Sequence, residues 1–194
     1  MTKNMEKASK AKQELYSWLR MMICVVLGAV LMFTLVLRIV RVDGSSMRDT
    51  LQDGDLLIAL SRHLSGELEN GDIVVVQREY FNNGQPIVKR IIATEGQTVD
   101  IDFDAGVVFV DGKELDEDYA LEPTFLEEGM KFPLTVPEDS YFLLGDNRNH
   151  SEDSRSIDLG TVTHEEVVGK AVLLVLPGES ANSGKREFGR MGLL

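Results

Sequence analysis

Residues 21–37 read MMICVVLGAVLMFTLVL, a run of seventeen residues without a charge, and Ile39 and Val40 extend it beyond Arg38. A helix rises about 1.5 Å per residue, so this run, with snorkelling flanks, crosses the roughly 30 Å hydrocarbon core of a bilayer. The run is apolar on every side and has no amphipathic stripe, which disfavours a buried helix of a soluble core. The sequence therefore predicts one transmembrane helix over residues 21–40.

The residues that follow this run distinguish an uncleaved anchor from a cleaved secretory signal. A cleaved signal has an apolar stretch of about 7–15 residues followed by a small-x-small site. Here the stretch is longer and Arg38-Ile39-Val40-Arg41 follows it. We therefore expect an uncleaved signal-anchor.

Charge is distributed unequally about the apolar run. Residues 1–42 carry seven basic and two acidic residues, a net charge of +5, which leaves −17 for the rest of a chain whose total is −12. Five of the basic residues precede the run, so the positive-inside rule favours a cytoplasmic tail over residues 1–20, although Arg38, Arg41 and Arg48 follow the run closely. Residues 41–194 would then form the extracytoplasmic domain of a single-pass protein of the cell membrane.

The charge of this outer domain also limits its partners. Binding to nucleic acid requires clustered Lys and Arg, so we expect no nucleic-acid partner for an acidic domain. The only cysteine, Cys24, lies in the apolar run, so no internal disulfide can form.

Beyond Val42 no helical period persists, and short apolar runs alternate with turn signals such as Asn70-Gly71 and Asp111-Gly112. Runs of this kind between dense turns are typical of an all-β domain. The strand candidates are residues 56–60, 73–77, 87–93, 98–103, 107–110, 141–144 and 170–176. Residues 98–135 form a more acidic excursion that contains one predicted hairpin, and we expect this excursion to be small and non-catalytic.

Three patterns that could hold a metal or a phosphate are incomplete. His164-Glu165-Glu166 begins like a zinc-helix motif but lacks the second His. Asp100, Asp102 and Asp104 have calcium-loop spacing without the required Gly and Glu, and they are better explained as the wet face of a strand. No Gly-Lys pair is followed by Ser or Thr. We therefore expect neither a metal nor another cofactor.

A Ser-His-Asp triad is conceivable from His150 with Asp146 or Asp153. All three residues lie in the single polar segment GDNRNHSEDSR, residues 145–155, where a solvated turn is the default interpretation of a lone His. Spacing alone gives this alternative little weight.

Four short segments occur in a distinctive order. They are VDGSSMRDTL at residues 42–51, GDIV at 71–74, VKRII at 88–92 and GDNRNHSEDSR at 145–155. In this order they resemble the type I bacterial signal peptidases, membrane-anchored proteases that cut leader peptides from exported preproteins. The resemblance runs from the apolar run to about Pro177. It implies the all-β signal peptidase fold, and the short chain resembles the Gram-positive form.

The resemblance also implies roles for single residues. Ser46, the Ser before Met47, matches the nucleophile, and its backbone N–H matches the oxyanion donor, while Ser45 is a turn residue. Lys89 matches the general base. The supporting residues are Ser151, which matches the serine bonded to the lysine amine, Asp153 and Arg155, which match a salt bridge, and Asp146 and Arg148, which shape the same loop.

Chemistry independent of the resemblance agrees with a Ser46/Lys89 dyad. A serine hydroxyl is a poor nucleophile until a base takes its proton, and a lysine amine accepts that proton only when neutral. On a strand Lys89 shares a face with Ile87 and Ile91, and apolar surroundings disfavour the ammonium form. Without the other residue of the pair, Lys89 would be interpreted as a solvated strand lysine and Ser46 as an ordinary turn serine.

Two positions depart from the family pattern. Asp49 stands where relatives usually have Pro, which adds a negative charge that favours protonated Lys89 if the side chains approach. Gly44 stands where some relatives have a serine that helps bind the oxyanion, which leaves mainly the Ser46 backbone N–H for that task.

The sequence therefore predicts a membrane-anchored serine endopeptidase that removes signal peptides from secretory preproteins after small-x-small sites. An extended substrate is expected to pair with a strand beside the site, with small side chains in two shallow apolar pockets. The expected partners are these signal peptides and the lipid bilayer. One alternative is a receptor that keeps the fold and binds leaders without cutting them, favoured only by Asp49. Another is a self-cleaving protein, disfavoured by the span.

Overall fold

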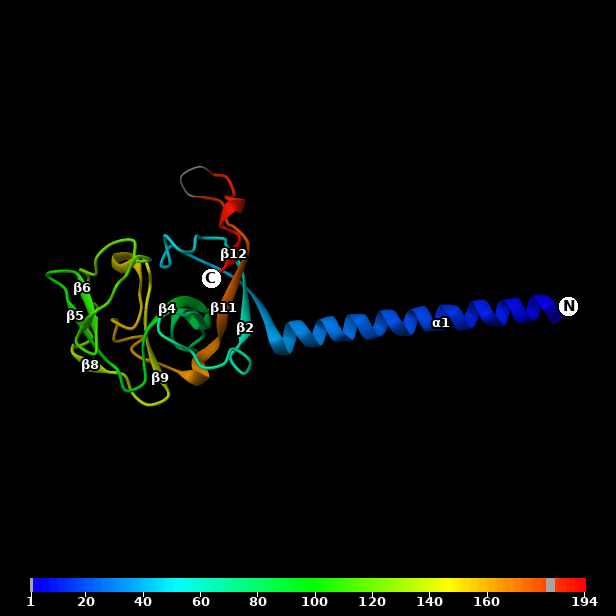
Figure 1. The fold of residues 1–194 in the computed structure, drawn as a ribbon, viewed down its shortest axis with the longest axis horizontal. Helices are drawn as coiled ribbons and strands as arrows, with labels where there is room; N and C mark the ends of the chain where they lie inside the picture. The colour runs from blue at the N-terminus through cyan, green and yellow to red at the C-terminus, as the bar shows by residue number, and fades with distance from the viewer. Residues whose placement is uncertain (1, 181–183) are drawn as a thin grey trace. The chain divides into compact units, whose positions relative to one another are not determined.

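The computed structural model describes residues 2–180 and 184–194, which fall into two units, residues 1–37 and 38–194 (Figure 1). In the first unit α1 (Thr2–Leu31) continues into a short π-helical segment, η1 (Met32–Val36). Its stretch Lys12–Val36 is long and apolar enough to cross a membrane. The helix thus begins earlier and ends earlier than the predicted span over residues 21–40.

The residues after Val36 form a strand because their partners lie in the folded domain. β1 (Leu37–Arg41) is the edge strand next to β2, and its Val40 packs against a buried cluster of the domain. Tertiary pairing therefore overrides the local hydrophobicity that assigned residues 37–40 to the span.

The second unit is all-β, as predicted. The strands after β1 are β2 (Leu56–Ser61), β3 (Ile73–Val76), β4 (Ile87–Thr94), β5 (Thr98–Asp102), β6 (Val107–Val110), β7 (Lys113–Glu114), β8 (Leu134–Thr135), β9 (Ser140–Leu144), β10 (Val162–Thr163), β11 (Val167–Leu176) and β12 (Gly192–Leu193). All seven predicted strands are confirmed within a few residues. The remaining short strands were not predicted.

Two antiparallel sheets organise these strands. The larger has the order β1-β2-β11-β3-β4-β9-β10, with β12 also paired to β11, and the smaller has the order β7-β6-β5-β8. The smaller sheet is formed by strands of the predicted excursion, residues 98–135. Asp102 caps the turn after β5 by accepting the Asp104 and Ala105 N–H groups at 3.0 and 2.9 Å.

In the β2–β11 region the larger sheet has one buried face. Its opposite face is partly exposed but is also formed by apolar side chains. On β2, Leu57 and Ala59 are buried, whereas the alternate residues Leu56, Ile58 and Leu60 are only half-buried. An ordinary one-sided sheet would carry polar residues at those alternate positions. Ile58 pairs with Leu173 of β11, which pairs with Leu193 of β12, and Leu193 is 87% exposed.

This apolar side extends onto β1. Val40 faces the core, so its neighbour Ile39 points to the opposite side and is 59% exposed. We call the residues on this side the outer apolar face: Ile39, Leu56, Ile58, Leu60, Leu173 and Leu193.

Candidate active site

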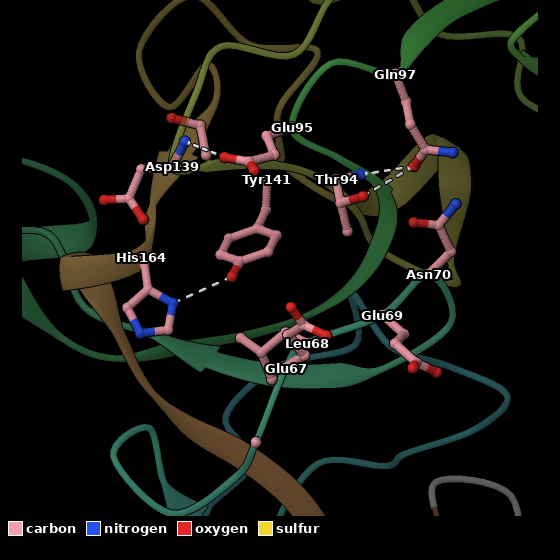
Figure 2. Close-up of a pocket in the computed structure, with 12 residues that line it drawn as sticks. Glu67, Leu68, Glu69, Asn70, Thr94, Glu95, Gln97, Asp139, Tyr141 and His164 are labelled. Carbon is pink, nitrogen blue, oxygen red and sulfur yellow. Dashed lines mark hydrogen bonds between the residues drawn. The ribbon is translucent and has the colours of Figure 1, made fainter.

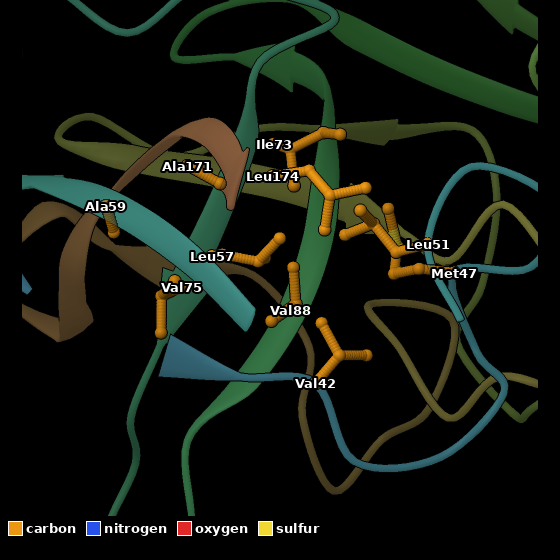
Figure 3. Close-up of a cluster of buried hydrophobic side chains, with 10 residues drawn as sticks. All are labelled: Val42, Met47, Leu51, Leu57, Ala59, Ile73, Val75, Val88, Ala171 and Leu174. Carbon is orange, nitrogen blue, oxygen red and sulfur yellow. The ribbon is translucent and has the colours of Figure 1, made fainter. Parts of the chain in front are cut away.

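The segment that carries Ser46 lies between β1 and β2 and is fixed by its own apolar residues. Val42, Met47 and Leu51 are buried in one cluster with side chains of β2, β3, β4 and β11 (Figure 3). Ser46 itself is only half-buried. We call residues 42–51 the serine turn, and its anchors hold Ser46 at the surface of the core.

Gly44 sets the shape of the serine turn. Its φ is +92°, a left-handed conformation that glycine adopts without strain. Its N–H donates to Asp53 Oδ1 at 2.9 Å. The Ser46 backbone N–H, in contrast, donates to no group of the described residues, so it is free for a ligand oxygen.

The polar loop, residues 145–155 after β9, packs directly on the serine turn. The Asn147 N–H donates to the Ser46 carbonyl and the Asn147 side-chain amide to the Ser45 carbonyl, both at 3.0 Å. A Cβ atom placed on Gly145 would lie 2.5 Å from the Ser46 carbonyl oxygen and would overlap the Ser151 side chain. Only glycine therefore allows Ser46 and Ser151 to approach this closely.

Lys89 lies in the middle of the sheet beside that contact. On β4 and β9, Arg90 pairs with Leu144, and continuing this antiparallel register places Lys89 across from Gly145. On the other side Lys89 pairs with Val74 of β3. The lysine is only 3% exposed. The structure thus brings Lys89, Ser151 and the Ser46 backbone to the same glycine.

Burial dominates the electrostatics of Lys89. It lowers the pKa of the amine from 10.5 to about 8, against the charges of Asp153, Glu128 and Glu152, which raise it, while Arg155 lowers it further. Among the described residues no carboxylate lies within ion-pair distance of the amine. A neutral amine is therefore accessible near pH 8.

Asp153 and Arg155 form the predicted salt bridge. Arg155 Nε donates to Asp153 Oδ1 at 2.8 Å and Nη2 to Oδ2 at 2.9 Å, and both side chains are fully buried. The Ser151 hydroxyl also donates to Asp153 Oδ2, at 2.8 Å. Because the Ser151 hydroxyl hydrogen is engaged with Asp153, the Ser151 oxygen can act towards an amine only as a hydrogen-bond acceptor.

Asp146 connects the polar loop to both neighbouring elements. Its carboxylate accepts two bonds from Arg90, at 2.8 and 2.6 Å, and one from the Thr50 hydroxyl of the serine turn at 2.5 Å. Arg148, fully buried, donates to the Gly145 carbonyl at 3.1 Å and to the Glu117 carboxylate at 2.7 and 2.5 Å. Both residues therefore fix the loop rather than reach Ser46.

Two predicted contacts are not made. Among the described residues the Ser151 hydroxyl bonds to Asp153 and no hydrogen bond joins it to the Lys89 amine. Within residues 2–180 and 184–194 no hydrogen bond joins the Ser46 hydroxyl to the Lys89 amine or to another group. Catalytic hydrogen bonds are often long in the absence of substrate and tighten when it binds.

The histidine alternative is not assembled. His150 is exposed, whereas the Asp146 and Asp153 carboxylates are taken by Arg90 and Arg155. His164 lies in a short turn whose capping box uses Glu166, and in the part of the chain that the structure describes no three candidate ligands gather into a metal site.

A cleft of about 700 Å³ opens beside Ser46. One wall is the serine turn with Arg41 and Asp53, and the other is the segment leading into β4. The residues of that second wall are Asn82, Asn83, Gln85, Pro86, Ile87 and Val88. The apolar residues of the lining are Val42, Met47, Pro86, Ile87 and Val88.

Comparison with known proteins matches this arrangement to one family. The family described as "Signal peptidase, peptidase S26" matches residues 15–176. The chain belongs to the signal peptidase family S26. It is therefore a serine peptidase, a hydrolase.

Individual family members are similar along nearly the whole chain. A signal peptidase I of Bacillus licheniformis is 33% identical over 180 residues, which cover 89% of this chain and 94% of the relative. Signal peptidase I T of Bacillus subtilis (strain 168) is 33% identical, with 90% and 92% covered. A crystal structure of a signal peptidase I from Enterococcus faecalis V583 is 34% identical, with 54% of this chain and 96% of that chain covered and a TM-score of 0.43.

The S26 peptidase has a second pocket, of about 690 Å³, that contains neither Ser46 nor Lys89 (Figure 2). Tyr141 and His164 meet there at 3.1 Å, and several carboxylates surround them. Burial and the charges of Asp139, Glu95 and Glu67 raise the pKa of Tyr141. Because Ser46 and Lys89 both lie outside its lining, this pocket is not the site of the candidate dyad.

Sequence reasoning missed the residues that hold the polar loop from outside. Glu117 and Thr124 bind Arg148, and the Tyr119 ring lies 4.1 Å from the Arg90 guanidinium carbon. These residues come from the excursion. Their one visible signal was a run of acidic and aromatic residues with no strand pattern.

Proposed function

We propose that this S26 peptidase removes N-terminal signal peptides from exported preproteins, with Ser46 as the nucleophile and Lys89 as the general base. The observation that carries the proposal is the buried Lys89 opposite Gly145, the glycine at which Ser46 and Ser151 meet. The names of its relatives, each a signal peptidase I, support the substrate class.

The reaction follows from the protonation states. Neutral Lys89 takes the proton of the Ser46 hydroxyl as Oγ attacks the scissile carbonyl carbon. The resulting oxyanion accepts a hydrogen bond from the Ser46 backbone N–H, which has no other partner among the described residues. The Lys89 ammonium then protonates the leaving amine, and the neutral amine activates the water that hydrolyses the acyl-enzyme.

The cleft beside Ser46 suits an extended peptide. An edge segment such as residues 85–88 can pair with a substrate backbone, while pockets take alternate side chains. Val42, Met47 and Ile87 are among the apolar residues of a lining that is otherwise largely polar. We propose cleavage after small-x-small sites, with the small side chains of the substrate lying against these apolar residues.

The outer apolar face and the N-terminal helix support a membrane location. The helix carries basic residues before its apolar part, which favours a cytoplasmic tail over residues 1–20 and a catalytic domain outside. The outer apolar face adds a surface suited to the lipid boundary.

A cleavage assay with the full-length, detergent-solubilised protein tests this function. Incubation with a preprotein should release a leader, and N-terminal sequencing should place the cut after a small-x-small site. The Ser46→Ala variant should be inactive and Ser45→Ala should keep most activity, because the Ser45 contacts are made by its backbone carbonyl. Leader binding without cleavage by the wild type would favour the receptor alternative.

A further inference from the structure

The second half of the excursion lies over the polar loop. We call residues 117–130 the strap. Its backbone and side chains bind the loop repeatedly: Leu121 N–H donates to the Asp146 carbonyl at 2.9 Å, Met130 N–H to the Arg155 carbonyl at 3.0 Å, and Arg155 Nη1 to the Leu126 carbonyl at 3.0 Å. The strap therefore places its own charged side chains beside the buried part of the site.

Glu128 of the strap reaches the Asp153–Arg155 pair. Its Oε2 accepts the Asp153 N–H at 3.4 Å, and its Oε1 lies 3.8 Å from Arg155 Nη2. The Glu128 side chain is 13% exposed and Arg155 is fully buried. One guanidinium thus faces two carboxylates, but Asp153 is the carboxylate that accepts its hydrogen bonds, and the other Nη2 bonds go to the Arg148 and Ser151 carbonyls.

The charges facing Lys89 come from the polar loop and the strap. Lys89 lies across from Gly145, whose N–H donates to Asp153 Oδ2 at 3.0 Å, and Glu128 in turn contacts Asp153 and Arg155. The charges of Asp153, Glu152 and Glu128 raise the pKa of Lys89, and that of Arg155 lowers it. The facing residue of β3 is the apolar Val74. On β4 itself the next residue, Arg90, points to the opposite side of the strand and is paired with Asp146.

These charges do not cancel. Arg155 compensates Asp153 through two close hydrogen bonds, and Glu152 is exposed, where solvent weakens its effect. Glu128 remains as the second, sheltered carboxylate against the single buried guanidinium. With Lys89 neutral the buried group of Asp153, Arg155 and Glu128 carries a net negative charge, and protonation of Lys89 neutralises it.

We propose that Glu128, which lies against the Asp153–Arg155 pair beside Lys89, is a positioning residue that favours the ammonium form of the Lys89 amine and so sets the lower pH limit of the peptidase. The consequence for activity rests on the proposed Ser46/Lys89 dyad. The Glu128 charge opposes the lowering of the Lys89 pKa by burial. Half-burial and the Asp153 charge in turn raise the pKa of Glu128 itself.

The test measures the titration of Lys89 without catalysis. Full-length protein in detergent, labelled with ¹³C at lysine Cε, is titrated by NMR, and the Lys89 signal is assigned by its loss in Lys89→Arg. Glu128→Gln keeps an acceptor for the Asp153 N–H and removes the charge. The Lys89 midpoint should fall by roughly half a unit to one unit.

Matched variants separate charge from structure. Glu128→Ala should give the same fall as Glu128→Gln, because both remove the charge, and Glu128→Asp should stay close to the wild type. Glu127→Gln, the same change at the exposed neighbour, should move the midpoint by less than about 0.2 unit. An unchanged or raised midpoint in both Glu128→Gln and Glu128→Ala would overturn the proposal, as would an equal fall in Glu128→Asp.

The kinetic measurement links this titration to the reaction. In Glu128→Gln the acidic limb of the kcat/KM profile should shift with the Lys89 midpoint, which raises cleavage at pH 7 by about 3- to 10-fold. A shifted Lys89 titration with an unshifted kcat/KM profile would uphold the coupling of Glu128 to Lys89 and refute the dyad instead.

Discussion

Lys89 combines two opposing physical requirements at one residue. A buried ammonium is costly, so burial alone makes the amine neutral, whereas every carboxylate nearby favours the cation. The polar loop limits the second effect because Asp153 is bound by Arg155, Ser151 and the Gly145 N–H. The proposed base therefore depends on how the neighbouring charges are paired.

The pH dependence of cleavage should report this amine. Below a midpoint of about 8 only the neutral fraction of Lys89 is active, so kcat/KM should rise about tenfold per pH unit and level off above the midpoint. Lys89→Arg should be inactive at every pH because a guanidinium does not deprotonate. Activity retained in Lys89→Arg together with loss in His150→Ala would transfer the role of base to histidine.

The same residue should cost stability. Because the folded pKa of Lys89 is below the unfolded value, the penalty is present in full below pH 8, shrinks between 8 and 10.5, and vanishes above. Lys89→Met should therefore raise the free energy of unfolding by about 3 kcal/mol at pH 7, measured by thermal or urea unfolding, with a smaller gain at pH 10.5. The exposed Lys131→Met serves as control. A less stable Lys89→Met protein at pH 7 would contradict this account.

At the scale of elements, strands were predictable where they were long enough to show a pattern. β4 and β11 carry eight and ten residues of mostly apolar sequence between turn signals. β7, β8, β10 and β12 have two residues each, too few for any periodicity, and they form because longer partners are already in place. β1 was assigned to the apolar run because its role depends on β2, which follows fifteen residues later.

The residues of the candidate site also fall into a predictable group and an unpredictable group. Ser46, Lys89 and the polar loop stand in recognisable segments, so their positions followed from the sequence. The partners from the strap did not, because Glu117 and Glu128 are two glutamates among many and only the fold brings them to Arg148 and Arg155.

The C-terminal tail is another element without a sequence signal, and it supports the serine turn from beyond the family match. Arg190 donates to the buried Asp55 carboxylate at 2.7 and 3.1 Å and to the Thr50 carbonyl at 3.2 Å. Asp55 also accepts the Gln52 N–H at 2.8 Å. The tail thereby fixes the end of the serine turn through the Asp55 carboxylate and the Thr50 carbonyl.

Arg190→Gln should destabilise the domain, because it leaves Asp55 charged and buried. The free energy of unfolding should fall by about 2 kcal/mol, which is less than for a fully buried pair because Arg190 is partly exposed. The cleavage rate should also fall. Arg186→Gln removes one hydrogen bond to the Pro177 carbonyl and should cost little. Adding Asp55→Asn to Arg190→Gln should recover part of the loss. No change in the unfolding free energy would show that the tail does not support the turn.

For the whole molecule, the boundary between the two units falls at the start of β1, after its first residue, Leu37. Removal of residues 1–36 leaves β1 and the contact of Val40 with the core, and should give a domain that folds and still cleaves peptides. Removal of residues 1–41 also removes that strand and its packing. The longer deletion should unfold at clearly lower urea concentration. Equal stability of the two truncated proteins would show that β1 contributes nothing to the domain.

The outer apolar face predicts that the domain without its anchor still binds lipid. The domain is strongly acidic, so anionic lipid repels it, and zwitterionic phosphatidylcholine vesicles isolate the apolar contribution. The protein lacking residues 1–36 should co-sediment with these vesicles, and the pair Ile39→Asp and Leu193→Asp should weaken co-sedimentation several-fold, because both exposed side chains lie on the outer apolar face.

A matched pair tests whether that face is specific. Leu121 and Ile157 are also exposed, at 46% and 70%, but they lie on the strap and after the polar loop. Leu121→Asp with Ile157→Asp adds the same charge and should leave vesicle binding nearly unchanged. If the two pairs weaken binding equally, added negative charge alone accounts for the loss. If only the first pair does so, the outer apolar face is the surface that contacts lipid.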